Sequence, residues 1–361
     1  RYAGFTHGLY NDPRVHIEVT EGRTYVRRTT ERFDLILVSL SDSFHPVTSG
    51  AYSLSEDYRY TVEALSDYLD RLSPGGLLVL TRWLQTPPTE SLRTLATFEA
   101  ALRAQGVARP QEHIAAFRSL RTMTFVVANA PLTAADRAAI RTFVASRGYD
   151  LVWLPGISPT EVNLRNQLPA PVYYRAFTAL LADPAGFVRS HAYDIRPSLD
   201  DRPFFFHYFR WRQTREILRT LGQTWQPFGG SGYLVLVALL ALATLLAIVL
   251  ILAPLALKRT AAASLAPRSG RRRILAYFFL LGLAFLFVEI PLAQRFILFV
   301  GQPVTALAVV LFALLLFSGL GSLSAPRWPL RQALLALVAV ALLTPLALRG
   351  VFALALGWPL T

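Results

Sequence analysis

The chain has 361 residues, 53% of them apolar, and a formal net charge of +13. It contains no cysteine, which excludes disulfides and thiolate chemistry. The apolar residues gather beyond about residue 225, so a water-facing domain followed by a membrane bundle is expected. Arginines are scattered over the first region and cluster beside the apolar stretches, which fits membrane topology better than nucleic-acid binding.

Residues 1–148 predict an α/β domain. Short apolar runs alternate with helical patterns, which is typical of a parallel sheet. The predicted strands are Arg14–Val19, Phe33–Leu40 and Gly76–Trp83, with a short helix ending near Thr30 and an amphipathic helix near Glu56–Leu72. Ligands of such sheets bind at the carboxyl ends of the strands. Here those ends carry Glu21-Gly22-Arg23 and Ser39-Leu40-Ser41-Asp42.

The remainder of the soluble region predicts a helix over Glu90–Gln105, an antiparallel hairpin at the sheet edge and a helix over Thr133–Ser146. The hairpin strands are His113–Phe117 and Thr122–Ala128. Residues 149–225 form an irregular connecting region with one helix, Val172–Leu181, and the stretch DIRPSLDDRPFFF. Its adjacent Asp200 and Asp201 are expected to pair with Arg196 and Arg202 and to lock the domain onto the membrane. A ligand role is the alternative.

Residues 226–361 predict a multi-pass transmembrane bundle with spans at about 233–257, 274–300, 304–326 and 332–348. The second span holds three polar residues, Glu289, Gln294 and Arg295. An ionised carboxylate inside a span costs roughly 2.5–3.5 kcal/mol, so Glu289 is expected to face a bundle interior or a cavity. It would belong either to a polar pathway or substrate site, or to a hydrogen bond that fixes helix packing.

Residues 12–83 contain DPRV, EGR, FDLILVSLSD, YSLSEDY and LSPGG in this order. They resemble the second half of the spermidine synthase (polyamine aminopropyltransferase) family. The stretches DIRPSLDDRPFFF and FVEIPLAQRFILFVGQP resemble the membrane-fused bacterial members of that family. The resemblance implies a Rossmann-like fold of the class I methyltransferase type. No glycine-rich turn precedes Asp12, so the fold is expected to be incomplete and the chain to be a fragment.

The resemblance also implies roles for individual residues. Glu21 and Gly22 would contact the adenosyl part of decarboxylated S-adenosylmethionine or S-adenosylmethionine, and Tyr52 would lie near the substrate. Ser39 stands where the family has its general-base Asp, and Asp42 matches a second acidic residue that would orient an amine. A hydroxyl removes a proton poorly, so Ser39 predicts weak or absent aminopropyl transfer. The alternatives are a polar turn for Glu21 and Gly22, a loop-stabilising Asp42 and a packing Tyr52.

The sequence therefore predicts a membrane-tethered, spermidine-synthase-like transferase, with the lipid bilayer and a polyamine or other small amine as partners. Methyl transfer is a variant of this hypothesis, and a non-catalytic ligand-binding or transport-coupled membrane protein is the alternative. The six histidines are scattered and no metal site is expected.

The expected location is the bacterial inner membrane, but the side of the α/β domain is ambiguous. The basic link 258–273 favours the cytoplasm, which would place the domain outside after a single crossing. Arginines on the domain side of the first span and the cytoplasmic location of S-adenosyl cofactors favour a cytoplasmic domain.

Overall fold

The computed structural model describes residues 4–5, 7–40, 56–85, 88–215, 231–252, 268–300, 303–324 and 328–355. The chain divides into two compact units. One comprises residues 30–259, and the other residues 1–29 together with 260–361. Asp42 and Tyr52 lie outside the described residues.

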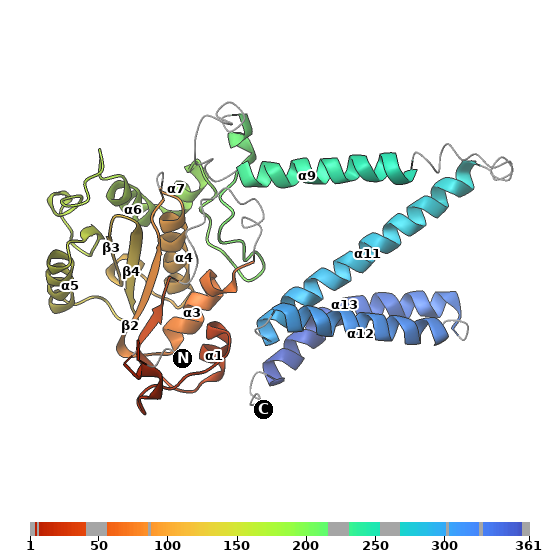
Figure 1. The fold of residues 1–361 in the computed structure, drawn as a ribbon, viewed down its shortest axis with the longest axis horizontal. Helices are drawn as coiled ribbons and strands as arrows, with labels where there is room; N and C mark the ends of the chain where they lie inside the picture. Colours follow the sequence, from red (N-terminus) through yellow and green to blue (C-terminus); the bar gives the residue numbers. More distant parts are fainter. Residues whose placement is uncertain are drawn as a thin grey trace. The chain divides into compact units, whose positions relative to one another are not determined.

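The unit of residues 30–259 is built on a five-stranded mixed sheet (Figure 1). Its strands are β1 (Phe33–Val38), β2 (Leu72–Trp83), β3 (Ile114–Arg118), β4 (Thr122–Ala128) and β5 (Asp150–Trp153), in the order β1-β2-β4-β3-β5. β1 and β2 are parallel, whereas β4 runs antiparallel to both β2 and β3, and β5 runs antiparallel to β3. The prediction of a parallel sheet is therefore correct for β1 and β2 only.

The short β3–β4 connection explains the mixed character of the sheet. Only three residues, 119–121, separate the two strands, and a parallel connection would need a crossover of a dozen or more. The predicted hairpin is confirmed, but its position at the sheet edge is wrong, because β4 pairs with β2 and β5 pairs with β3. The strand predicted at Arg14–Val19 is also wrong, since these residues have no strand structure.

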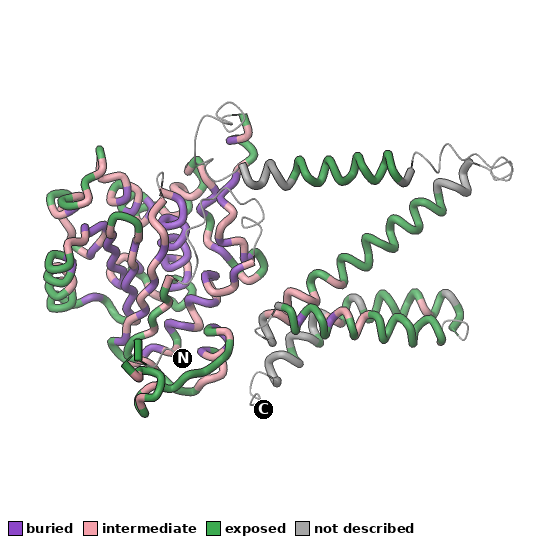
Figure 2. The backbone as a smooth tube through the Cα atoms, in the orientation of Figure 1, coloured by how far each residue is buried: buried purple, intermediate pink, exposed green. Residues whose placement is uncertain are grey.

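Helices cover the two faces of the sheet unequally. One face carries α3 (Val62–Asp70), α4 (Glu90–Ala104) and α6 (Val172–Ala182), and α4 is buried along most of its length (Figure 2). Phe125 of β4 lies between Phe98 of α4 and Phe177 of α6, with ring centroids 5.7 and 5.9 Å apart. The other face packs Ala115, Phe117 and Val126 against Val144 of α5 (Ala134–Ser146). Leu35 and Leu37 of β1 are 56% and 60% exposed.

Local sequence signals account for most helix ends. Thr133 and Asp136 form the capping box of α5, and Glu21 accepts the Thr24 N–H at the start of α1 (Gly22–Arg28). α3 begins at Val62, later than predicted, because Thr61 caps it after a short 3₁₀ helix over Tyr58–Tyr60. α7 (Pro184–Ser190) was not predicted. Further 3₁₀ turns are Leu9–Asn11, Pro110–Glu112, Pro159–Glu161 and Trp211–Gln213.

β5 also escaped prediction, and its first residue shows what holds it. The buried carboxylate of Asp150 accepts the backbone N–H groups of Leu164, Arg165 and Asn166 at 2.7–2.8 Å. Burial opposes ionisation of Asp150, but these hydrogen bonds and the nearby Arg118 guanidinium keep its pKa below the ordinary value. A loop from the connecting region thus secures the end of the sheet.

The Pro74-Gly75-Gly76 sequence lies inside β2 and does not precede it. The parallel register jumps here, since Phe33 faces Leu72 and Leu35 faces Leu77. Asn129 clips this bulge: its Oδ1 accepts the Gly75 N–H at 3.2 Å, and its Nδ2 donates to the Ser73 carbonyl at 2.6 Å.

The apolar helices are α9 (Ser231–Ala247), which continues as a π-helix over Ile248–Leu252, α11 (Arg268–Val300), α12 (Pro303–Ser324) and α13 (Leu330–Ala355). Two stretches are long and apolar enough to cross a membrane, Arg273–Ile297 and Val304–Ser324. They match two of the four predicted spans. The apolar stretches Val237–Leu250 and Arg331–Thr344 are shorter.

Gly76 offers a test of the β2 bulge. A Cβ atom at this position would lie 2.9 Å from the carbonyl oxygens of Phe33 and Ser73, which are both backbone atoms. We expect Gly76→Ala to lower the free energy of unfolding by about 1–3 kcal/mol, in the range of other overpacked sites. Thermal unfolding of the detergent-solubilised chain, followed by near-ultraviolet circular dichroism, measures this. Gly22→Ala is the control, since a Cβ at Gly22 meets nothing within 4 Å. Equal melting of the two variants would contradict the bulge.

Candidate functional site

The carboxyl end of β1 places Ser39 at the edge where a substrate site was predicted. Val38 lies opposite Leu80 of β2, and Ser39 follows directly with an exposed side chain. Thr81 follows Leu80, and its hydroxyl is 3.0 Å from the hydroxyl of Thr124 on β4. Side chains alternate along strands, so all three hydroxyl groups belong to the α5 face of the sheet. The result is a polar row at one end of an otherwise apolar face.

Two other predicted site residues, Glu21 and Gly22, stand at the start of α1. Glu21 caps α1, with its Oε2 accepting the Thr24 N–H at 2.8 Å, and Gly22 is the first residue of that helix. Both belong to the unit of residues 1–29 and 260–361, whereas Ser39 belongs to the other unit. The expected contact of Glu21 and Gly22 with an adenosyl group stays a prediction.

The carboxyl end of β2 carries a buried polar cluster on the α4 face of the sheet. The fully buried Arg82 donates from Nε to Glu90 Oε1 at 2.6 Å and from Nη1 to the Tyr60 hydroxyl at 2.7 Å. Its guanidinium carbon lies 4.4 Å from the centre of the Tyr60 ring and 5.4 Å from the rings of Phe205 and Phe206. Two phenylalanines of the PFFF sequence thus pack against a buried cation.

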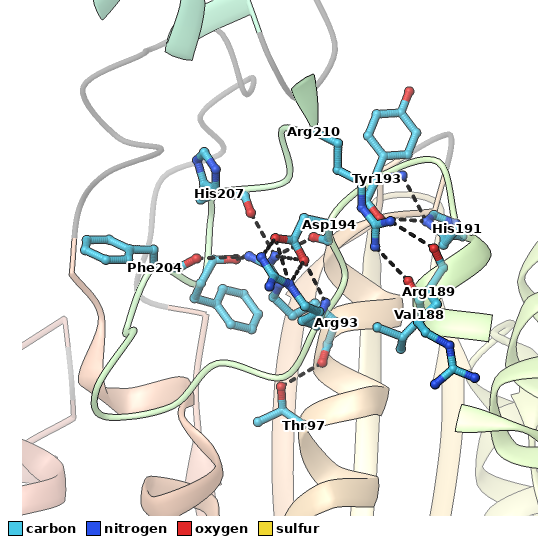
Figure 3. A network of polar contacts seen from close by, with 12 residues as sticks. Arg93, Thr97, Val188, Arg189, His191, Tyr193, Asp194, Phe204, His207 and Arg210 are labelled. Atoms are coloured by element: carbon cyan, nitrogen blue, oxygen red, sulfur yellow. Dashed lines mark hydrogen bonds and ion pairs between the residues drawn. The ribbon is translucent and has the colours of Figure 1, made fainter. Parts of the chain in front are cut away.

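A second buried arginine organises the connecting region (Figure 3). The Arg93 side chain on α4 is 4% exposed, and it donates to four backbone carbonyl oxygens. These belong to Asp194, Phe204, Phe205 and His207, and the last three lie at 2.9, 2.6 and 2.8 Å. Arg93 Nη2 also lies 3.6 Å from the Asp194 carboxylate. We refer to residues 194–209, which contain these four carbonyl groups, as the 194–209 segment. Its backbone folds around one guanidinium.

The 194–209 segment also binds α3, which changes the role expected for its acidic residues. Asp200 accepts the Thr61 hydroxyl at 2.7 Å, and its N–H donates to Glu63 at 3.0 Å. The expected pairing of Arg196 with Asp200 or Asp201 is wrong, because Arg196 donates to Asp194 from Nε at 2.8 Å. Thr61 and Glu63 begin α3, so Asp200 fastens the segment to the α/β domain itself.

The electrostatics of Asp194 reflect its two arginine partners. Burial opposes its ionisation, but the hydrogen bonds from Arg196 and the charge of Arg93 outweigh this effect and lower its pKa to about 2. The pKa of nearby His207 is also lowered, by burial and by the Arg93 charge, and for a histidine this favours the neutral ring at pH 7. Asp194 therefore stays ionised throughout the physiological range.

In the other unit, the polar residues of α11 coincide with its half-buried part. α11 is exposed from Arg273 to Val288, whereas Glu289, Gln294 and Arg295 are half-buried. α11 packs against α12, whose Ala306 and Val310 are buried. The polar residues thus coincide with the half-buried positions of α11, and both hypotheses for Glu289 stay predictions.

Sequence reasoning did not single out Arg82, Glu90, Arg93 or Asp194. A usable signal exists for the two arginines, since each interrupts an apolar pattern: Arg82 ends the run LLVLT, and Arg93 lies on a helix turn between Leu92 and Leu95. Among the described residues, no group of three or more His, Asp or Glu side chains is arranged to hold a metal ion.

Comparison with known proteins gives a distant relationship. No protein-family model matches the chain. A segment of 89 residues is 32% identical to polyamine aminopropyltransferase 1 of Pseudomonas aeruginosa. The aligned segment covers 25% of this chain and 28% of that relative, so the chain spans less than a third of the relative's length. The chain is therefore distantly similar to an aminopropyltransferase of the spermidine synthase type.

Replacing Arg93 tests whether one guanidinium holds the 194–209 segment. Arg93→Met leaves four carbonyl oxygens without this donor and Asp194 without one cation. Breaking a buried ion pair costs about 3–5 kcal/mol, and we expect a loss of this size together with faster proteolysis between residues 194 and 209. Arg103→Met on the same helix removes a half-exposed pair with Glu99 and should cost about 0.5 kcal/mol or less. Comparable losses for the two variants would contradict this account.

The pKa of Asp194 predicts an acid-induced loss of stability. Its pKa falls from 3.8 to about 2 on folding, so its contribution is complete above about pH 4 and is lost as the pH falls towards 2. Chemical denaturation of the full chain at intervals through this window should show a steeper decline than that of Asp194→Asn, in which only other carboxylates such as Asp150 contribute. A decline of the same steepness in this variant would assign the effect to other carboxylates.

Proposed function

We propose that the chain is part of a membrane-attached, spermidine-synthase-like transferase that moves an aminopropyl group from decarboxylated S-adenosylmethionine to a small amine. The observation that carries the proposal is the 89-residue similarity to a polyamine aminopropyltransferase. The parallel pair β1–β2 supports it, because Ser39 stands at the carboxyl end of β1, where sheets of the Rossmann type bind ligands. β3 also runs in the direction of β1 and β2, and β4 alone is reversed among these four strands.

The proposed reaction is a nucleophilic substitution at carbon. The co-substrate supplies an electrophilic methylene carbon attached to a sulfonium sulfur. A new carbon–nitrogen bond forms to the acceptor amine, the carbon–sulfur bond breaks, and its electron pair stays on the sulfur as a neutral thioether. The amine loses one proton, so the protein must hold the amine in its neutral form near an acceptor for that proton.

This chain supplies candidate groups for both tasks. Asp42 orients the amine through its charge and accepts the proton, while Ser39 binds the amine through its hydroxyl, and Tyr52 packs beside the acceptor. Glu21 and Gly22 each have one feature that fits an adenosyl group. Glu21 Oε2 accepts a helix N–H, and within the described part of the chain nothing lies within 4 Å of a Cβ placed at Gly22, so a ligand can approach the backbone there.

The membrane attachment rests on the two apolar stretches, Arg273–Ile297 and Val304–Ser324. We place the chain in a bacterial inner membrane, with further passes from the shorter apolar helices α9 and α13 and the α/β domain in the cytoplasm, where the co-substrate is made. Glu289, Gln294 and Arg295 would then lie within the bilayer at a helix interface.

A second candidate is a non-catalytic domain that binds a ligand and transmits this to the membrane helices. Ser39 favours it, because a serine in place of a carboxylate removes both the base and one negative charge that attracts an amine. Methyl transfer from S-adenosylmethionine is a variant of the first candidate.

Calorimetric titration separates these candidates. The detergent-solubilised full chain is titrated with decarboxylated S-adenosylmethionine and with S-adenosylmethionine. Preference for the decarboxylated form supports aminopropyl transfer, and preference for S-adenosylmethionine supports methyl transfer. Absence of binding to both would make the non-catalytic candidate the leading one.

Restoring the carboxylate tests the role of the β1 end. We expect Ser39→Asp to raise aminopropyl transfer to a diamine by about a hundredfold or more, since a positioned general base contributes roughly 10²–10⁴-fold. Ser39→Asn is the matched control, because it has nearly the same shape without the charge and should leave the rate unchanged. The assay follows formation of the thioether product by chromatography. Equal rates for both variants would refute the role of this position, and an unaltered rate in Asp42→Asn would refute that of Asp42.

A further inference from the structure

A cationic pocket lies on the unit of residues 30–259, and its lining includes none of Ser39, Thr81 and Thr124. It has a volume of about 500 Å³, which is within the range of small-molecule sites. Its walls come from the carboxyl end of α7, from both ends of the 194–209 segment and from the two residues that follow this segment. The hydrogen bonds from the Arg93 guanidinium to the Asp194 and His207 carbonyls thus fix the backbone on one side of the pocket.

The charge of the pocket is predominantly positive. Arg189, Arg196 and Arg210 line it together with one carboxylate, Asp194, and Asp194 already accepts from Arg196 and lies beside the buried Arg93. His207 also lines it but is neutral at pH 7, because burial and Arg93 lower its pKa. Burial lowers the pKa of Arg210, the charge of Asp194 opposes this, and the charges of Arg212 and Arg196 add to it. With three arginines and one carboxylate in its lining, the pocket keeps a net positive charge that an anion would neutralise.

Arg210, which lines the pocket, and Arg212, two residues further along, are both held in position by the end of α7. Arg210 donates from Nη1 to the carbonyl of Arg189 at 3.0 Å and from Nη2 to that of Val188 at 2.7 Å (Figure 3). Arg212 donates to the carbonyls of Ser190 and His191. Both side chains thus satisfy carbonyl groups at a helix end, where such groups lack intrahelical partners. A guanidinium has five N–H donors, so Arg210 retains donors for an oxyanion.

The pocket also carries an aromatic side chain that points to the source of the anion. Trp211 lines it, is 64% exposed, and stands edge-on to the buried Phe209 ring at 5.3 Å. Twenty residues further along the chain, at Ser231, the apolar helix α9 begins. Exposed tryptophan together with arginine shortly before an apolar helix is the composition of a membrane–water interface.

We propose that this pocket binds a phosphate group, with an anionic phospholipid headgroup as the favoured source and free phosphate as the other. The arginines hold the phosphate oxygens through charged hydrogen bonds, and Trp211 contacts the glycerol or upper acyl region. A polyamine would be repelled here, so this site is separate from any amine site at the β1 end. The inference does not depend on the transferase activity.

The test uses the full chain in a neutral detergent and three probes in separate calorimetric titrations. These are a short-chain phosphatidylglycerol, a short-chain phosphatidylcholine and inorganic phosphate. We expect the phosphatidylglycerol to bind at least tenfold more tightly than the phosphatidylcholine. Arg210→Gln should weaken this binding about tenfold or more, because a hydrogen bond to a charged group is lost. Arg109→Gln, which alters an exposed pair with Glu112, should change nothing.

Trp211→Ala separates the two sources of phosphate. Weaker phosphatidylglycerol binding with unchanged phosphate binding supports the lipid headgroup. Equal affinity for phosphate and phosphatidylglycerol, with no effect of Trp211→Ala, assigns the pocket to free phosphate. Absence of binding to every probe, or binding that Arg210→Gln leaves intact, overturns the proposal. Arg189→Gln provides a second variant if circular dichroism shows that Arg210→Gln does not fold.

Discussion

The buried guanidinium of Arg93 is the constraint on which the soluble part of this chain depends. A cation inside a protein needs partners for its donors, and the two Nη groups of Arg93 find them in carbonyl groups from four residues spread over Asp194–His207. These carbonyls converge only if the backbone curls around the side chain. A stretch that reads as a connecting region is therefore packed onto α4 as part of the domain.

The same logic applies one turn earlier on α4, where Glu90 pairs with Arg82 from the end of β2. Phe205 and Phe206 close over that pair, so the PFFF sequence is an apolar cover for a buried ion pair. The PFFF sequence thus has a packing role that needs no catalytic explanation. Its effect is to fix the end of β2, next to the β1 end where Ser39 stands.

Elements with strong local signals were predictable from the sequence. α4 and the β3–β4 hairpin follow from periodicity, and α5 follows from its capping box. Strand direction and β5 were not, because pairing partners far apart in sequence leave no local trace. Ser39 could be placed at a strand end. The Arg93 network could not, since its acceptors are backbone carbonyls about a hundred residues away, and any residue type supplies a carbonyl.

β1 has a practical consequence for anyone handling part of this protein. It is the terminal strand of the sheet within the described residues, and it bears the exposed Leu35 and Leu37. A terminal strand offers a row of free backbone donors and acceptors. Proteins usually protect such edges with charged side chains, proline or a covering helix or loop. A truncated product beginning near residue 30 would carry this exposed edge strand into solution. An exposed edge strand of this kind promotes dimers by edge-to-edge strand addition, and inclusion bodies at high expression.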